Sequence, residues 1–279
     1  MNTNATAPDE ALPPCLRRDD EAAVGGDLAI AVGSVAGWVH RRVGRPNQDA
    51  AQVVRTAAGV AIAVCDGCGS GKRSEIGATF GARLWTRALA ERLVAGPMTA
   101  ADLGEVADVV LDRLAVVAAT LGDDRVEVTR EHFLFTSLVA VVTDTQVVVG
   151  AIGDGVIGLG DVVHVLGPFA DNAPPYLTEA WFGQRRELAT WTRGKDEIDR
   201  LILATDGAGP LVAPPRDSPS LAELADEGAI YRNPYALERR LRLLADDGLQ
   251  IDWDAHRTYR RAALLDDDTT AVCVRWGQR

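Results

Sequence analysis

The chain has 279 residues, of which 47% are hydrophobic and 25% charged, and its formal net charge at pH 7 is −11. These proportions are close to globular averages and exclude a disordered, collagen-like or coiled-coil chain. The acidic balance excludes a non-specific binder of nucleic acid or of an anionic membrane surface, because both would repel the chain.

Residues 1–25 are rich in Pro, Asp, Asn and Ala without a hydrophobic period, and we predict a mobile tail there. The first ten residues have no basic or apolar part of a secretory signal, and no apolar run reaches the ~18 residues of a membrane span. Four cysteines are too few for a disulfide scaffold of this length. We expect a cytoplasmic protein with reduced thiols that binds no membrane and no nucleic acid.

Short apolar runs that end at Gly or Asp predict buried strands over residues 28–37 and 60–66. A long helix is predicted next, up to the break at Gly96-Pro97. Its apolar residues recur at i+4 spacing: Ile76, Phe80, Leu84 and Ala88. A second helix follows, because one face stays apolar from Leu103 to Leu121.

The second half of the chain predicts mainly strands. Residues 136–155 have the pattern of one hairpin, and residues 156–167 could form another. Further apolar strands are predicted over 201–207 and 270–276, with a helix behind Asn233 and Pro234 between them. Two sets of strands flanked by helices favour one layered domain over residues 26–279, although two small domains would also fit the length.

Aspartates stand at the ends of these strands and in the turns beside them: Asp49, Asp66, Asp154, Asp206 and the run 266–268. Each one alone is most simply a turn residue, because Asp-Gly is an ordinary turn dipeptide. Several carboxylates in one cleft would repel one another, and bound cations would relieve that repulsion. Oxygen ligands suit Mg²⁺ or Mn²⁺, so the pattern favours a divalent-metal site.

The order of the motifs resembles the protein phosphatase 2C family of metal-dependent serine/threonine phosphatases, especially its compact bacterial members. The resemblance runs from about Val35 to Trp276 and rests on the segments VHRRVGRPNQDA, CDGCGSGKRSEIGA, FTSLVAVV, GAIGDG, LILATDG and DDDTTAVCV. It implies an α+β fold of four layers, with two central antiparallel sheets flanked by helices. It also implies a phosphorylated protein substrate, made by a serine/threonine kinase, which is hydrolysed by water activated between two Mn²⁺ or Mg²⁺ ions.

The resemblance also implies the metal ligands. Asp49 matches the first ligand, Asp66 matches the residue that bridges two metals, and the Gly67 carbonyl is a further ligand. Asp206 matches a ligand of one of the two metals. Asp154 matches an acid that holds a looser third metal in some relatives.

The last ligand lies in the C-terminal run of aspartates. Asp267 fits the family pattern best, and Asp268 is the next choice, because three successive aspartates leave the register open by one. Gln48 stands where many relatives have Glu beside the first Asp. Neighbours in an extended segment point to opposite sides, so we expect Gln48 to reach the site only through a water molecule.

Two further departures concern the catalytic residues. The family's phosphate-binding Arg position is Gly44 here, and the nearby Arg45, Arg42 or Arg41 could serve instead. Cys68 replaces the His of the common DGH turn, which leaves His40 as the candidate general acid. These departures keep open an alternative class, a phosphatase-like regulatory binding module with little or no turnover. A thiol redox protein built on the CDGC segment is a third possibility.

Overall fold

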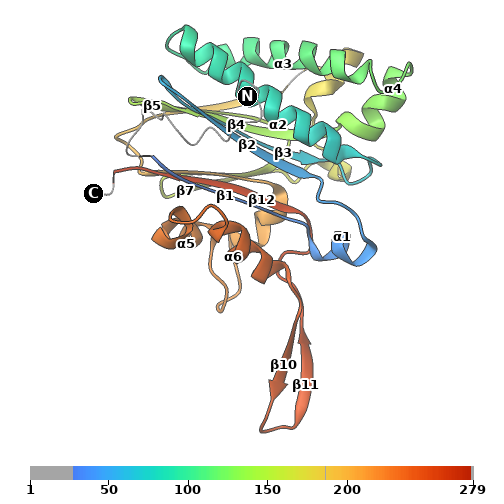
Figure 1. The fold of residues 1–279 in the computed structure, drawn as a ribbon, viewed down its shortest axis with the longest axis vertical. Helices are drawn as coiled ribbons and strands as arrows, with labels where there is room; N and C mark the ends of the chain where they lie inside the picture. The colour runs from blue at the N-terminus through green and yellow to red at the C-terminus, as the bar shows by residue number, and fades with distance from the viewer. Residues whose placement is uncertain (1–27, 186, 278–279) are drawn as a thin grey trace, which may run out of the picture.

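The computed structural model describes residues 28–185 and 187–277, so the predicted tail lies outside the described residues. Two antiparallel sheets face each other, and helices cover the outer face of each (Figure 1). This arrangement confirms the predicted α+β fold with four layers. None of the described helices is long and apolar enough to cross a membrane.

The first sheet has the strand order β2-β3-β4-β5-β8. Its strands are β2 (Asp49–Thr56), β3 (Gly59–Gly67), β4 (Phe135–Val142), β5 (Gln146–Ile152) and β8 (Ala189–Gly194). The second sheet has the order β1-β12-β9-β6-β7. Its strands are β1 (Ala29–Val35), β12 (Thr269–Arg275), β9 (Arg200–Ala204), β6 (Gly155–Leu159) and β7 (Val162–Leu166).

Two long helices, α2 (Ser74–Ala95) and α3 (Asp102–Ala118), cover the first sheet (Figure 1). The shorter helices α5 (Leu221–Asp226) and α6 (Ala236–Ala245) cover the second sheet. The remaining helices are α1 (Trp38–Val43), α4 (Arg125–Val128), a π-turn at Thr129–Phe133 and the 3₁₀ turns Ala170–Asn172, Leu177–Phe182, Asp206–Leu211 and Gly228–Tyr231. A separate hairpin is formed by β10 (Gly248–Asp252) and β11 (Arg257–Arg261).

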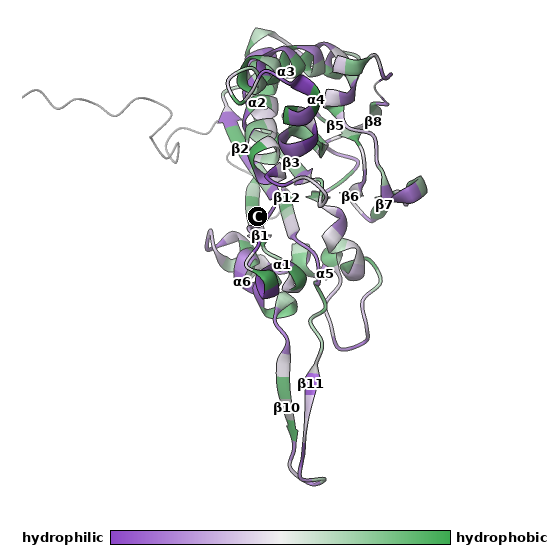
Figure 2. Cartoon of the chain, turned by 90° about the vertical axis from the view of Figure 1, so that its right-hand side faces the viewer, coloured by the Kyte–Doolittle hydropathy of each residue, from purple (hydrophilic) through white to green (hydrophobic). Residues whose placement is uncertain are grey.

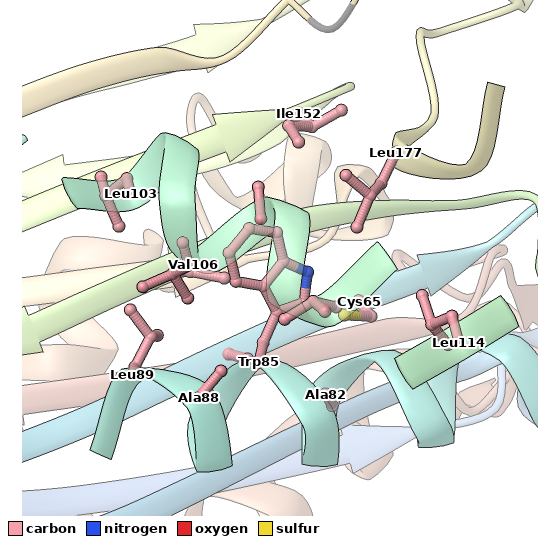
Figure 3. Close-up of a cluster of buried hydrophobic side chains, with 14 of the residues drawn as sticks. Cys65, Ala82, Trp85, Ala88, Leu89, Leu103, Val106, Leu114, Ile152 and Leu177 are labelled. Atoms are coloured by element: carbon pink, nitrogen blue, oxygen red, sulfur yellow. The ribbon is translucent and has the colours of Figure 1, made fainter. Parts of the chain in front are cut away.

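Each strand of the first sheet contributes to two apolar layers, because successive side chains point to opposite faces. On β3, Ala63 and Cys65 face the helices, whereas Ile62 and Val64 face the other sheet. Trp85 lies at the centre of the helix side (Figure 3), and its indole N–H donates to Ser137 Oγ at 3.2 Å. Cys65 is fully buried in this layer, which gives it a structural role.

The buried face of α2 differs from the i+4 stripe noted in the sequence. Small residues face the sheet, and of the stripe only Ala88 is buried, while Phe80 is 39% exposed. A Cβ added at Gly77 would lie 2.0 Å from the His132 carbonyl oxygen, and one at Gly81 would lie 2.3 Å from the Phe135 ring. At these two positions the helix therefore approaches its neighbours too closely for a side chain.

Several elements were not anticipated, namely α1, β2, β8 and the hairpin of β10 and β11. The helix expected behind Asn233 begins two residues later than Pro234, at Ala236. Asn233 still caps the turn, because its Oδ1 accepts the N–H of Tyr235 at 2.9 Å. The hairpins predicted over 136–155 and 156–167 are both present, as β4–β5 and β6–β7.

Candidate metal centre

A cavity of about 560 Å³ opens at the end of the two sheets where most of the predicted aspartates lie. The register of the first sheet places Asp49 opposite Asp66, and Asp66 opposite Thr136 on β4. The second sheet contributes Asp206, two residues after the end of β9, and Asp267, two residues before the start of β12. Strand ends from both sheets therefore bring together residues from distant parts of the chain.

Three carboxylates meet in this cavity. One oxygen each from Asp66, Asp154 and Asp206 lies within 4.8 Å of the other two. Asp154 sits in the turn between β5 and β6, where Gly153 and Gly155 on either side have φ values of 94° and 133°. Such values favour glycine, so the turn that presents Asp154 depends on these two residues.

The carboxylates of the cavity lie close enough to repel one another, and a bound cation would relieve that repulsion. Burial raises the pKa of Asp66 well above its usual value, and the charges of Asp49 and Asp206 raise it further. Burial and Asp206 raise the pKa of Asp154 to about 6. Among the described residues that line the cavity there is no Lys or Arg. Divalent cations such as Mg²⁺ or Mn²⁺ prefer oxygen ligands, and here no basic side chain of the cavity lining competes for the carboxylates.

Asp49 lies behind these three residues and does not line the cavity. Its Oδ2 accepts a hydrogen bond from Thr205 Oγ1 at 2.8 Å, whereas Oδ1 is buried without a partner in the described part of the chain. Burial raises the pKa of Asp49 well above its usual value. An orphaned, buried carboxylate oxygen beside the acidic cluster fits a site that takes up a hydrated cation.

The structure distinguishes Asp267 from Asp268. Asp268 is only 3% exposed, and both of its carboxylate oxygens are used. Oδ1 accepts the N–H of Gly37 at 2.8 Å, and Oδ2 accepts the N–H of Gln48 at 2.6 Å and His40 Nδ1 at 2.8 Å. Asp267 lines the cavity and uses only Oδ1, which accepts the N–H of Asp268. Asp267 therefore has a carboxylate oxygen available for a ligand.

Asp268 also sets the orientation of His40. A carboxylate can only accept, so Nδ1 of His40 must carry the hydrogen of this bond. The ring lines the cavity, and Nε2 is the nitrogen left for a ligand or a proton transfer. His40 thus has a fixed tautomer when neutral and a proton to donate from Nε2 when charged.

Gln48 lines the cavity, while its neighbour Asp49 does not, and its contact with the site through a water molecule stays a prediction. Its Nε2 donates to Ser74 Oγ, and its Oε1 is buried without a partner in the described part of the chain. Both residues are buried, and β2 begins at Asp49.

The three candidate phosphate-binding arginines lie outside the cavity lining. The Arg42 guanidinium carbon is 4.5 Å from the ring centre of Trp38, and Arg45 donates to the Gly71 carbonyl oxygen at 2.7 Å. Cys68, which stands where the resemblance expects His, does line the cavity, with Sγ 3.1 Å from Ser70 Oγ.

Sequence reasoning missed the residues on the opposite wall, which the segment 171–176 supplies. Tyr176 lies there beside Cys68, and burial, then Cys68, raise the pKa of its phenol above the usual value. The hydroxyl therefore stays protonated and can donate a hydrogen bond into the cavity. No motif marks this segment, because nothing in its local pattern indicates that it folds back over the strand ends.

Without a cation, the protein is expected to lose stability as the pH rises from about 4 through about 6. An unfolded Asp titrates near ~3.9, whereas the fold raises the pKa of Asp154 to about 6 and those of Asp49 and Asp66 also upward. The folded state therefore binds more protons in this window, and that stabilisation disappears above it. Thermal unfolding in EDTA across the window measures the effect, and saturating Mn²⁺ should reverse it.

Two variants test which groups cause the loss of stability at higher pH. Asp154→Asn should reduce the pH dependence, because it removes one of the raised carboxyl groups. Asp144→Asn changes an exposed aspartate in the β4–β5 turn and should leave the pH dependence of stability unchanged. A metal-free protein whose stability increases across this pH window would contradict the assignment.

The sequence profile of the family described as Protein phosphatase 2C matches residues 36–242, whereas no curated protein sequence matches the chain. Among solved structures, the serine/threonine phosphatase Stp1 from Staphylococcus aureus is 16% identical, with a TM-score of 0.57 over 92% of this chain and 98% of that chain. PppA, a regulatory component of T6SS in Pseudomonas aeruginosa, is 17% identical, with a TM-score of 0.55 over 90% and 98%. The catalytic domain of PstP, in complex with two manganese ions, is 18% identical, with a TM-score of 0.51 over 90% and 99%. At these identities the similarity establishes a common fold.

Proposed function

The chain belongs to the protein phosphatase 2C family, and on that premise we propose that it is a metal-dependent serine/threonine protein phosphatase. Its substrates would be phosphoserine and phosphothreonine in proteins. The observation that carries the proposal is the group of Asp66, Asp154 and Asp206, whose carboxylates converge within 4.8 Å in a cavity lined by no described Lys or Arg.

The proposed ligands of two cations, Mn²⁺ or Mg²⁺, are Asp66, the Gly67 carbonyl, Asp206 and Asp267. A pair of bound cations supplies a water of lowered pKa and positive charge for the phosphoryl oxygens. Asp154 would hold a weaker third ion, as the resemblance to the family implies. Asp49, whose Oδ1 is free, would orient water molecules around the ions. Asp268 is better described as a support for His40 and for the start of α1.

We assign to His40 the role of general acid. It is the only imidazole among the described residues that line the cavity, and Asp268 holds Nδ1, so the Nε2 proton is directed to the bound substrate. An alkoxide leaving from phosphoserine needs that proton, because serine is a poor leaving group. The hydroxyl of Tyr176 is a neutral group that can donate to the phosphate, whereas Nε2 of Gln48 already donates to Ser74 and Gly71.

Release of phosphate from a small aryl phosphate, with Mn²⁺, Mg²⁺ or EDTA, tests the proposal. Turnover that requires Mn²⁺ or Mg²⁺ and that EDTA abolishes supports an enzyme. A folded protein without turnover in any metal would instead support the second candidate, a regulatory module that binds phosphoproteins. The replacement of the family's His by Cys68 is the observation that favours this second candidate.

Arg42→Ala and Arg45→Ala are each expected to change kcat/KM for a small aryl phosphate by less than about fivefold, because neither side chain lines the cavity. An arginine that grips the phosphate would cost ~1.5–3 kcal/mol, which is about 10- to 150-fold. Steady-state kinetics at saturating Mn²⁺ decide between these outcomes. A loss above tenfold in either variant would show that the arginine reaches the substrate.

Asp154→Asn should leave tight binding of two Mn²⁺ ions nearly intact and slow the chemical step, because its proposed ion is the weaker one. Gln48→Glu should tighten Mn²⁺ binding by up to ~10-fold, as it adds a charge to a residue that lines the cavity. Calorimetric titration of Mn²⁺ into wild type and both variants measures these changes. Loss of both tight sites in Asp154→Asn, or unchanged affinity in Gln48→Glu, would contradict the scheme.

A further inference from the structure

The hairpin of β10 and β11, residues 248–261, projects from the body as an arm (Figures 1 and 2). Its two strands pair with each other and with no other described strand. Asp252 holds the turn, since its Oδ1 accepts the N–H groups of Asp254 and Ala255 at 3.1 and 2.9 Å. At the base, Arg260 forms an ion pair with Asp247 and lies 5.9 Å from the Trp38 ring centre. The arm is therefore a formed hairpin whose two edges are both open.

An exposed apolar row follows one strand of the arm. Leu249 and Ile251 on β10 are 73% and 48% exposed, and Trp253 in the turn is 77% exposed. Leu249 and Ile251 lie two residues apart and so face the same side of the ribbon. A two-stranded hairpin alone is at best marginally stable in water, and an open apolar edge is a template for another strand. The arm thus has the features of a surface that another strand covers.

The two edges of the arm differ in charge. The β11 edge has the sequence Arg257-Thr258-Tyr259-Arg260-Arg261, with three arginines in five residues. The β10 edge has Gly248-Leu249-Gln250-Ile251-Asp252, with a single acid at its end. Charged side chains, especially basic ones, are a common device against edge-to-edge pairing. The β10 edge lacks this protection and is the edge that accepts a partner.

The β10 strand is complementary to itself. In an antiparallel pair of two β10 strands centred on Gln250, Leu249 faces Ile251 of the second copy, and Gly248 faces Asp252. Apolar side chains then meet across the pair, and no like charges oppose each other. The same operation on β11, centred on Tyr259, would set Arg257 against Arg261 twice, which is destabilising.

We propose that this chain forms a symmetric dimer in which the β10 edges of two arms pair to make a four-stranded sheet. Strands of five residues bury less than the ~1,200–2,000 Å² of a stable interface, so the dimer depends on concentration. Each chain carries a net charge of −11, so two chains repel one another, and salt strengthens the association by screening that repulsion. An acidic partner held by the arginines of β11 would show the opposite salt dependence.

Sedimentation velocity of the full chain, from about 1 µM to about 1 mM at low salt and at about 0.5 M salt, tests the dimer. We expect a monomer that converts to a dimer, with tighter association at high salt. Ile251→Lys should weaken the association at least ~10-fold, because it places two like charges in the apolar row. Leu243→Lys, which changes a 61% exposed residue on α6, is the matched control and should leave it unchanged. A monomer throughout, or a dimer that Ile251→Lys does not weaken, overturns the proposal.

The register is tested separately by cross-linking. Gln250→Cys places a thiol on the two-fold axis, and mild oxidation should give a disulfide-linked dimer above the level of the wild-type chain. Tyr259→Cys, on the neighbouring strand, should give no increase. Equal thermal unfolding of all variants shows that they fold. Cross-linking of Gln250→Cys that is no greater than that of Tyr259→Cys overturns the register.

Discussion

Asp66→Asn and Asp206→Asn are each expected to remove nearly all phosphatase activity while leaving the fold intact. Each takes a carboxylate from the group that converges within 4.8 Å, and the proposed reaction depends on the cations that this group would hold. The expected loss is ~10³-fold or more in kcat, in the range seen when a group central to a reaction is removed. Steady-state hydrolysis of an aryl phosphate at saturating Mn²⁺ measures it.

The same variants should show the opposite effect on stability. In EDTA, Asp66→Asn should unfold at a higher temperature than wild type, because burial and the charges of Asp49 and Asp206 disfavour the ionised Asp66. Asp144→Asn, in an exposed turn, should change neither activity nor stability. If either active-site variant keeps more than about a tenth of wild-type turnover, the ligand assignment is wrong.

His40→Gln is expected to lower kcat by ~10²–10⁴-fold on a phosphoserine peptide, the usual contribution of a general acid. The loss should be much smaller on an aryl phosphate, because a phenolate leaves without a proton more easily than an alkoxide. Comparing kcat on the two substrates isolates the role of the proton.

Asp268→Asn should reproduce part of this effect, because it weakens the hydrogen bond that orients His40. It should also destabilise the protein, since the carboxylate accepts three N–H groups. His256→Gln, in the turn of the arm, is the control and should be neutral. An equal loss on both substrates in His40→Gln would mean that His40 supports the site without donating a proton.

Local pattern sufficed for much of the architecture. The apolar runs around Ile62 and Leu203 predict strands because apolar β-branched and aliphatic residues in short runs suit a buried sheet. The acids that follow such runs, Asp66 and Asp206, were identifiable as site residues because a strand end gives a carboxylate a rigid support. The order of motifs along the chain was enough to indicate the family and, through it, two sheets between layers of helices.

Other features depend on contacts between distant segments. The buried face of α2 is set by the His132 carbonyl and the Phe135 ring, which leave no room for a Cβ at Gly77 or Gly81. A hydrophobic period cannot reveal these two positions, because glycine has no apolar side chain. Likewise, Tyr176 enters the cavity only because segment 171–176 folds back over the strand ends.

The C-terminal aspartates show most clearly the difference between what the local sequence pattern predicts and what contacts between distant segments add. The sequence alone predicted that a carboxylate before β12 belongs to the site, with Asp267 as the first choice and Asp268 as the second. The tertiary structure shows how differently the two side chains are held: Gly37, His40 and Gln48, more than 200 residues away, direct three N–H groups at Asp268, whereas within the described part of the chain Asp267 accepts only the N–H of Asp268. The physical reason is that a carboxylate saturated by donors supports its neighbours, whereas one with a free oxygen can bind a cation.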